Sequence, residues 1–328
     1  MKYRISFLFC LLFSAVICSA DDIDSQWSEM MPLASKSLLL DIQEIAPKVL
    51  ITVGERGHIL KSKDGGQSWK QVRVPTRSTL TGLDFIDDKR GWVVGHDSTV
   101  LYTDDGGEHW TLQYRDADAE QPLFDVKMQS PNEGFAVGAY GLMLHTTNSG
   151  QRWNIIEPSR LEDPAFGYPH FYKIAPLADG LVMVGEAGMI AKLPGDDPAG
   201  WSRSPIDYNG SFFSIAELAD GVLLVVGLRG HIYRSVDSGT TWQHIKTETV
   251  DNFYDVAYEP NTRRVAVVGA DGSVLLSFDN GMHFRHYRLT ERETLNAVLW
   301  TSEGKLIGVG FGGVKDLNQF VTQALNNQ

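Results

Sequence analysis

Hydrophobic residues along this chain come in short runs that repeat at a regular interval. A seventeen-residue pattern, VGERGHILKSKDGGQSW in its first copy, occurs five times without a gap, starting at Val53, Val94, Val137, Val226 and Val268. Altered copies start at Val184 and Val309. The glycines of the seven Val-Gly pairs are 41 to 47 residues apart, a period typical of four-stranded propeller blades.

Each repeat contains four strand signals. Two apolar runs precede a Val-Gly pair, such as residues 80–86 and 91–94, and an alternating run follows it, such as residues 58–62. The fourth signal follows the tryptophan that ends the pattern. We name these strands a, b, c and d in chain order. The pattern predicts an all-β fold, a seven-bladed propeller of four-stranded antiparallel blades, which forms a single domain over residues 21–328.

The turn between strands c and d contains an acidic or amide side chain followed by glycine. In residues 62–69, SKDGGQSW, the Asp64 carboxylate can accept backbone N–H groups just ahead of it, and glycine permits a positive φ. The tryptophan can bury its ring between neighbouring blades. Because Asn148 fills the acidic position in one copy, we interpret these residues as structural, not catalytic. The structural set is Asp64, Asp105, Asn148, Asp237, Asp279, Trp69, Trp110, Trp153 and Trp242.

The last repeat has neither an Asp turn nor a tryptophan after Val314. Trp27, near the other end of the chain, stands at the same spacing from Gly54 as Trp69 does from Gly95. We therefore expect the N-terminal strand to complete the last blade and close the ring, because such pairing removes an exposed sheet edge.

Residues 1–20 have the pattern of a secretory signal peptide. Lys2 and Arg4 precede an apolar run from residue 5 to 17, and Ala20 precedes the expected cleavage site. Lipid attachment at Cys18 is the alternative. Both cysteines, Cys10 and Cys18, fall in this segment, so the exported chain has no thiol chemistry. We expect a periplasmic location.

Composition and charge indicate a globular protein and argue against one class of partner. The chain is 43% hydrophobic and 21% charged, as expected for a globular protein. Its formal net charge of −12 argues against a nucleic acid partner.

The whole repeat, VGxxGxIxxSxDGGxxW, resembles the Asp-box (BNR) propellers, and its seven copies resemble the photosystem II stability/assembly factor family. The resemblance covers nearly all of residues 21–328. It implies a non-enzymatic exported propeller that binds a membrane or envelope protein, or its precursor, and helps it assemble. If the source is a phototroph, the resemblance implies a location in the thylakoid lumen. We expect no cofactor and a monomer.

The alternative function is a BNR-type glycoside hydrolase that acts on carbohydrate, such as a sialidase. A sialidase needs an arginine cluster beside a tyrosine and a glutamate, with an Arg-Ile-Pro-like segment early in the chain. Residues 73–75, Arg-Val-Pro, are the nearest match, but they follow Trp69 on the outer side of a blade. We therefore assign no catalytic residues. His58 and His231 occupy the same repeat position on different blades, so we expect no metal site.

The b–c turns, on the face opposite the Asp turns, are the expected site for a partner. Family members use an arginine-rich surface, and the resemblance points to Arg56 and Arg229, each before a turn glycine. Tyr140 occupies the same turn position. One d–a loop, residues 157–170, is longer than the others and contains Phe166, Tyr168 and His170. Aromatic residues on such a loop are common protein anchors, although an insertion folded back on the rim is the structural alternative.

Overall fold

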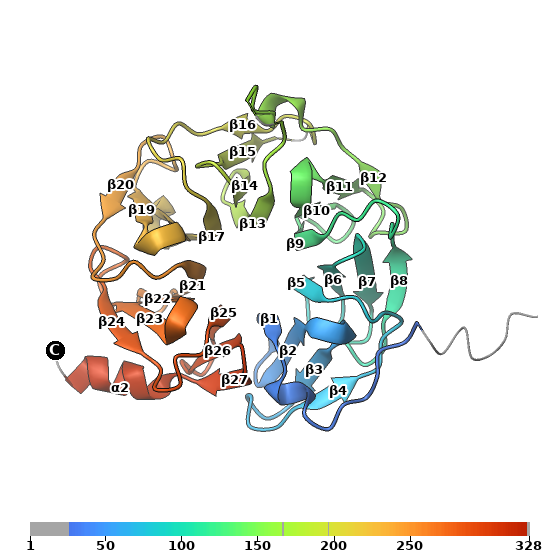
Figure 1. Cartoon of the computed structure of the whole chain (residues 1–328), viewed down its shortest axis with the longest axis horizontal. Coiled ribbons are helices and arrows are strands. Elements are labelled where there is room, and N and C mark those ends of the chain that lie inside the picture. The colour runs from blue at the N-terminus through green and yellow to red at the C-terminus, as the bar shows by residue number, and fades with distance from the viewer. Residues whose placement is uncertain (1–25, 166, 196, 327–328) are drawn as a thin grey trace, which may run out of the picture.

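The computed structural model describes residues 26–165, 167–195 and 197–326. These residues form seven antiparallel sheets arranged in a ring around a central axis (Figure 1). Six sheets have four strands and one has three. The structure confirms the predicted seven-bladed all-β propeller. The predicted signal peptide, residues 1–20, lies outside the described residues.

The first two strands of each blade lie nearest the axis. The innermost strands are β1 (Leu39–Ala46), β5 (Leu80–Phe85), β9 (Leu123–Met128), β13 (Phe171–Leu177), β17 (Phe212–Glu217), β21 (Phe253–Glu259) and β25 (Leu295–Trp300). The second strands are β2 (Val49–Gly54), β6 (Gly91–Gly95), β10 (Gly134–Gly138), β14 (Gly180–Gly185), β18 (Leu223–Gly227), β22 (Arg264–Gly269) and β26 (Leu306–Gly310).

The third and fourth strands lie towards the outside of the ring. The third strands are β3 (Ile59–Ser62), β7 (Thr99–Thr103), β11 (Met143–Thr146), β15 (Ile190–Pro194), β19 (Ile232–Ser235), β23 (Ser273–Ser277) and β27 (Gly313–Asp316). The fourth strands are β4 (Lys70–Val72), β8 (Thr111–Tyr114), β12 (Asn154–Ile155), β16 (Ser202–Arg203), β20 (Gln243–Ile245) and β24 (Arg285–Arg288).

The repeated Val-Gly pair has a steric explanation. All seven valines are fully buried. A Cβ added to any of the seven glycines would lie 1.9 to 2.2 Å from the carbonyl oxygen of the residue before strand a; for Gly95 that oxygen belongs to Thr79. The next residue along, His96 in this blade, donates its N–H to the same Thr79 oxygen at 2.8 Å. Glycine is therefore required where strand b passes the start of strand a.

The hydrophobic core is divided among the interfaces between blades. In the described part of the chain, seven buried clusters each join two neighbouring blades. Between the first two blades, for example, Ile51 and Val53 pack with Leu83, and Trp110 meets the edge of Phe85 at 5.9 Å between ring centroids. This continuous packing around the ring sets the position of the inner strands and their turns.

The prediction that the N-terminal strand completes the last blade is wrong. Among the described residues, the last sheet consists of β25, β26 and β27. Trp27 instead lies beside the first blade, where the Arg73 guanidinium is 5.4 Å from its ring centroid. Ser28 donates its N–H to Val74 O at 2.9 Å, so the N-terminal segment follows the chain beyond β4.

A C-terminal helix covers the outer side of the last blade instead. Helix α2 (Asn318–Asn326) buries Phe320, Val321 and Ala324 in a cluster with Leu306 and Leu276 (Figure 1). The helix therefore shields apolar surface that a fourth strand covers in the other blades. No helix among the described residues is long and apolar enough to cross a membrane.

Candidate functional site: the face of the b–c turns

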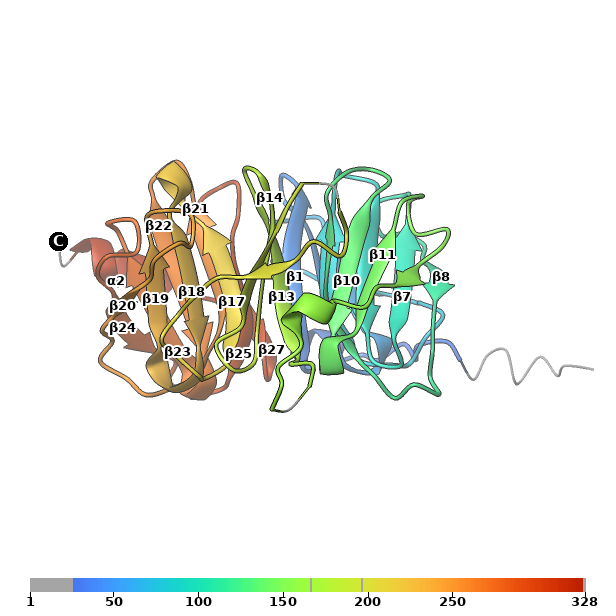
Figure 2. The ribbon, with the colours of Figure 1, turned by 90° about the horizontal axis from the view of Figure 1, so that it is seen from above.

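The two faces of the ring carry different turns. The Asp turns lie with the a–b turns, since Gly65 N donates to Lys48 O at 2.9 Å. The b–c turns lie with the d–a loops on the other face. The connection between β12 and β13, which contains the 3₁₀ turn η4 (Ser159–Leu161), lies on this face (Figure 2).

Six of the seven b–c turns present one side chain from a left-handed backbone position. The second residue after the Val-Gly glycine has a φ between 51° and 57° in six blades. These residues are Arg56, Asp97, Tyr140, Ala187, Arg229 and Asp271. The glycine that follows in most copies also has a positive φ, which completes the short turn. Tyr140 is 63% exposed, and this geometry directs it away from the core.

The long loop anchors an aromatic cluster at this face. The Nδ1 atom of the His170 ring accepts the backbone N–H of Tyr140 at 2.9 Å. The backbone N–H of His170 donates to the Glu186 carboxylate at 3.0 Å. Its ring lies 4.6 Å from the Tyr140 ring and 6.2 Å from the Phe124 ring, between centroids. His170 therefore joins the long loop, a b–c turn and an inner strand in one cluster.

A row of half-buried aromatic rings extends from this cluster around the mouth of the channel. Phe124, Tyr172, Phe213 and Tyr254 are the second residues of β9, β13, β17 and β21, and we call them the aromatic row. Successive ring centroids are 5.5, 5.0 and 5.4 Å apart. Burial raises the pKa of Tyr172 to about 12, so its hydroxyl is neutral. The row offers apolar area with polar edges, which is typical of protein contact sites.

The aromatic row was missed in the sequence, although a signal was present. Each of these strands starts with an apolar pair: Leu-Phe, Phe-Tyr, Phe-Phe or Phe-Tyr. A register shift between the first and third residues of each of these strands leaves the second residue without a direct partner. The first residue enters the core and the second stays half-buried at the rim. Only the first residue is fully buried, as Phe171 and Phe212 show.

The other predicted partner residues lie in separate places. Tyr168 lies against Gly141 and donates its hydroxyl hydrogen to Glu157 at 3.2 Å, close to Tyr140. Phe166 lies outside the described residues. Arg56 and Arg229 are exposed on the first and fifth blades. The structure therefore brings Tyr140, Tyr168 and His170 together but does not add either arginine to them.

The channel behind the aromatic row contains charged residues in a cavity of about 220 Å³. The ammonium of Lys173 lies 3.4 Å from Asp125 and 3.8 Å from Asp41. Burial raises the pKa of Asp125 to about 7 despite this cation, whereas the surrounding carboxylates raise the pKa of Lys173 against the effect of burial.

These carboxylates also connect neighbouring blades. Asp125 accepts the N–H of Ile174 in the next blade at 2.9 Å, and Asp41 accepts that of Leu83 at 3.0 Å. Asp84 and Asp255 make the same type of bond to Met128 and Val298. The seven inner strands, all of them described, contain no arginine.

The residues of the Asp turns are engaged in local bonds. Asp64 Oδ1 accepts N–H groups from Gln67 and Ser68 at 3.0 and 2.9 Å, and hydrogen bonds led by the Ser68 hydroxyl lower the pKa of Asp64 to about 2. Trp69 and Trp110 donate their ring N–H to Gly66 and Gly107. Asp105, Asn148, Asp237 and Asp279 accept equivalent backbone bonds, and Trp153 and Trp242 occupy the equivalent inter-blade positions.

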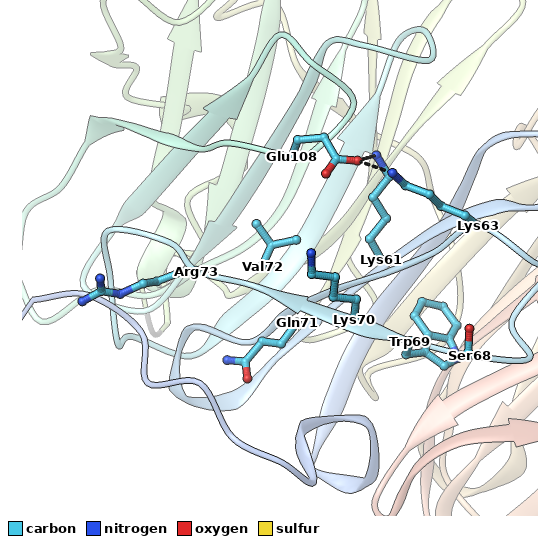
Figure 3. Close-up of a pocket in the computed structure, with 9 residues that line it drawn as sticks. All are labelled: Lys61, Lys63, Ser68, Trp69, Lys70, Gln71, Val72, Arg73 and Glu108. Carbon is cyan, nitrogen blue, oxygen red and sulfur yellow. Dashed lines mark hydrogen bonds and ion pairs between the residues drawn. The ribbon is translucent and has the colours of Figure 1, made fainter.

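A basic groove of about 430 Å³ lies on the outer side of the first blade (Figure 3). Lys61 and Lys63 both reach Glu108, at 2.6 and 2.8 Å, and these two hydrogen bonds lower the pKa of Glu108 to about 2. The Lys61 and Lys63 ammonium groups of this groove are therefore already paired with a carboxylate. No group of three His, Cys, Asp or Glu side chains able to hold a metal ion occurs in the described residues.

This architecture defines a class: a seven-bladed Asp-box propeller with an aromatic face around its channel. The chain belongs to the family described as photosynthesis system II assembly factor YCF48, whose model matches residues 67–244. It is 25% identical over 197 residues to the photosystem II assembly lipoprotein Ycf48 of Synechococcus sp. (strain CC9902), covering 59% of this chain and 57% of that protein. It is 27% identical over 143 residues to the photosystem II stability/assembly factor HCF136 of Arabidopsis thaliana, covering 41% and 35%.

Solved structures share the fold. YCF48 bound to D1 peptide has a TM-score of 0.67 at 20% identity, covering 88% of this chain and 95% of that one. YCF48 from Cyanidioschyzon merolae has a TM-score of 0.69 at 19% identity, covering 88% and 97%. The chain spans about half or less of the length of the curated relatives named above. These relatives are named as assembly factors, not enzymes.

Proposed function

We propose that this protein is a non-enzymatic assembly factor that binds a membrane or envelope protein, or its precursor, through the face of the b–c turns. The observation that carries this proposal is the aromatic row, Phe124, Tyr172, Phe213 and Tyr254, which continues into Tyr140 and His170. Amphipathic rings give large contact area at low entropic cost. Family membership and the solved complex of YCF48 with D1 peptide support a peptide segment as the ligand.

The location that fits this function is outside the cytoplasm, in the periplasm or a thylakoid lumen. Residues 1–20 have the pattern of an export signal, and two relatives are named as lipoproteins. Lipid attachment at Cys18 is the alternative to cleavage after Ala20.

A glycoside hydrolase is not favoured. The chain is similar in structure to an ancestral GH74 enzyme, but at 13% identity this similarity shows the fold alone. The inner strands lack the arginines that a sialidase uses, and the channel carboxylates accept backbone hydrogen bonds between blades. Hydrolysis of a sialoside or of xyloglucan by the purified chain, abolished by Asp84→Asn, would contradict the proposal.

The direct test measures binding of a D1 peptide to the purified protein and two variants. Tyr172→Ala removes one ring from the aromatic row, and we expect about a tenfold or greater loss of affinity, on the order of 1.4 kcal/mol or more. Met282→Ala, on the Asp-turn face and 48% exposed, is the control and should bind as the parent does.

The two ways in which this test can fail are distinct. If the peptide does not bind the parent protein, the partner is not of the D1 type. If it binds and Tyr172→Ala has no more effect than Met282→Ala, the aromatic row is not the contact surface.

A further inference from the structure

A small cavity lies at the b–c turn of the first blade, separate from the aromatic row. Its volume is about 150 Å³, and it is lined by Glu29, Met31, Arg56, His58 and Arg77. These residues come from three places: the N-terminal segment, the turn η2 (Glu55–Gly57) with the residue after it, and the loop between β4 and β5.

His58 is the inner wall of this cavity and has no protein partner. It is only 1% exposed, yet neither ring nitrogen forms a hydrogen bond within the described residues. Burial lowers the pKa of His58, so the ring is neutral and carries one N–H donor and one acceptor. An unsatisfied buried donor costs about 1 to 3 kcal/mol. A ligand in the cavity can relieve this cost.

An unpaired guanidinium beside the unsatisfied His58 ring makes this cavity suited to an anion. The exposed Arg56 guanidinium forms no hydrogen bond or ion pair within the described part of the chain. Arg77 pairs with Glu29 at 3.0 Å and donates to Trp27 O at 2.9 Å. Arg56 and Arg77 stand against two carboxylates: Glu29, which pairs with Arg77, and Glu55, which also acts on His58. Glu55 accepts the N–H of Leu38 at 3.3 Å, so Arg56 is left as the unpaired cation. Arginine matches the planar, two-oxygen shape of a carboxylate.

The fifth blade provides a natural comparison, because it has the same Arg-Gly-His sequence. There the ring of His231 is satisfied: Nδ1 lies 2.9 Å from Leu228 O, and the ring packs 4.7 Å from that of Tyr208. Gly230 lies against Thr249 O as Gly57 lies against Thr76 O, but Thr247 takes the place that Ser28 of the N-terminal segment has in the first blade. The sequence motif alone therefore does not make the site.

We propose that the cavity at the first blade binds a carboxylate, with Arg56 supplying the cation and His58 donating its N–H. This site is separate from the aromatic row, and its test does not depend on binding of a D1 peptide. A volume of about 150 Å³ admits a group the size of acetate or the carboxyl end of a peptide.

The test is an NMR titration of the full chain with sodium acetate at constant ionic strength, following the imidazole signals of its nine histidines. We expect a saturable shift of the His58 signal. Arg56→Asn should weaken acetate binding at least tenfold, whereas Arg229→Asn, the matched control, should not. Asparagine is chosen because it tolerates the positive φ of both positions. Both residues are exposed, so both variants should fold.

The source of the carboxylate is distinguished by adding the tripeptide Ala-Ala-Ala with a free or an amidated C-terminus. Binding of the free-acid peptide at least tenfold tighter than acetate assigns the site to a peptide terminus, and equal affinities assign it to a small carboxylate. The proposal is overturned if the His58 signal does not saturate, if chloride produces the same shift, or if Arg229→Asn weakens binding as much as Arg56→Asn.

Discussion

Asp279 shows how a single side chain holds one Asp turn. Its Oδ1 accepts hydrogen bonds from Ser277 Oγ at 2.8 Å and from the N–H groups of Met282 and His283 at 3.0 Å. Burial alone would raise the pKa of Asp279, but the bonds from His283 and Ser277 outweigh it and lower the pKa. Asn148 accepts the equivalent bond from Arg152 N at 2.9 Å, so the turn needs an acceptor oxygen and not an acid.

We therefore expect Asp279→Ala to lower the free energy of unfolding by about 1 to 2 kcal/mol, because backbone N–H groups lose their acceptor. Asp279→Asn should stay within about 0.5 kcal/mol of the parent. Urea denaturation followed by tryptophan fluorescence measures both. Equal losses in the two variants would show that the charge matters, which contradicts this account.

A second residue-scale prediction concerns pH. Burial raises the folded-state pKa of Asp125 to about 7, above its ordinary value of 3.8. The folded protein therefore holds a proton that the unfolded chain releases, so this residue's contribution to stability is complete below about pH 4 and is lost as pH rises to about 7. Asp255, whose pKa burial also raises, acts in the same direction.

Asp125→Asn removes this titration while keeping an oxygen that can accept the N–H of Ile174. We expect the slope of unfolding free energy against pH, between pH 4 and 7, to become less negative by up to about 1.4 kcal/mol per pH unit. Denaturation midpoints across that range supply the slope. Parallel curves for parent and variant would rule out Asp125 as the titrating group.

Sequence reasoning at this scale worked where chemistry repeats and failed where it depends on a neighbour. The Asp turns repeat, so Asp64 and its equivalents could be interpreted from the pattern. His58 and His231 share one motif, but only the structure places the N-terminal segment over His58 and Tyr208 beside His231. No spacing within a repeat could indicate that difference.

At the scale of elements, repeat spacing predicted the strands well because the glycine of each Val-Gly pair is a steric requirement. The end of the chain was predicted less well. Trp27 matched the repeat spacing, yet the segment that contains it bonds beyond β4, and α2 takes the covering role at the last blade. Residues 317–326 carry no repeat signal, so periodicity gave no means of placing them.

This helix leads to a prediction. Phe320 is 7% exposed, and its ring lies 5.5 Å from that of Tyr287. We expect Phe320→Ala to lower the free energy of unfolding by about 3 kcal/mol, through lost burial and the cavity left behind. The control is Leu325→Ala, because the Leu325 side chain lies on the same helix and is 47% exposed. A loss below about 1 kcal/mol would show that α2 does not stabilise the blade.

At the scale of the whole molecule, the first and last blades meet without sharing a strand. Leu39, Ile42 and Leu50 pack with Ile307 and Val309 in one buried cluster. Asn296 also donates to Leu39 O at 3.1 Å, and Lys48 pairs with Glu303 at 3.0 Å. The exposed ion pair contributes little, so apolar packing holds this seam.

We expect Leu39→Ala, at a fully buried position, to lower the free energy of unfolding by about 2 to 5 kcal/mol. Because every blade has two neighbours, the loss should appear in a single transition, with coincident near- and far-ultraviolet circular dichroism curves. Leu112→Ala, 42% exposed on β8, is the control. Two separated transitions in the variant would show that the blades unfold independently.

Within the described residues, no strand is shared between the first and last blades. Each repeat of the sequence therefore corresponds to one blade of the structure. Strands 1 to 4 of a blade are consecutive in the chain, and neighbouring blades meet through side chains and Asp-to-backbone bonds of one repeating type. Duplicating or deleting one unit of 41 to 47 residues would therefore add or remove one whole blade. Ring size in such a protein can change by gene duplication in single steps, without leaving an unpaired half-blade behind.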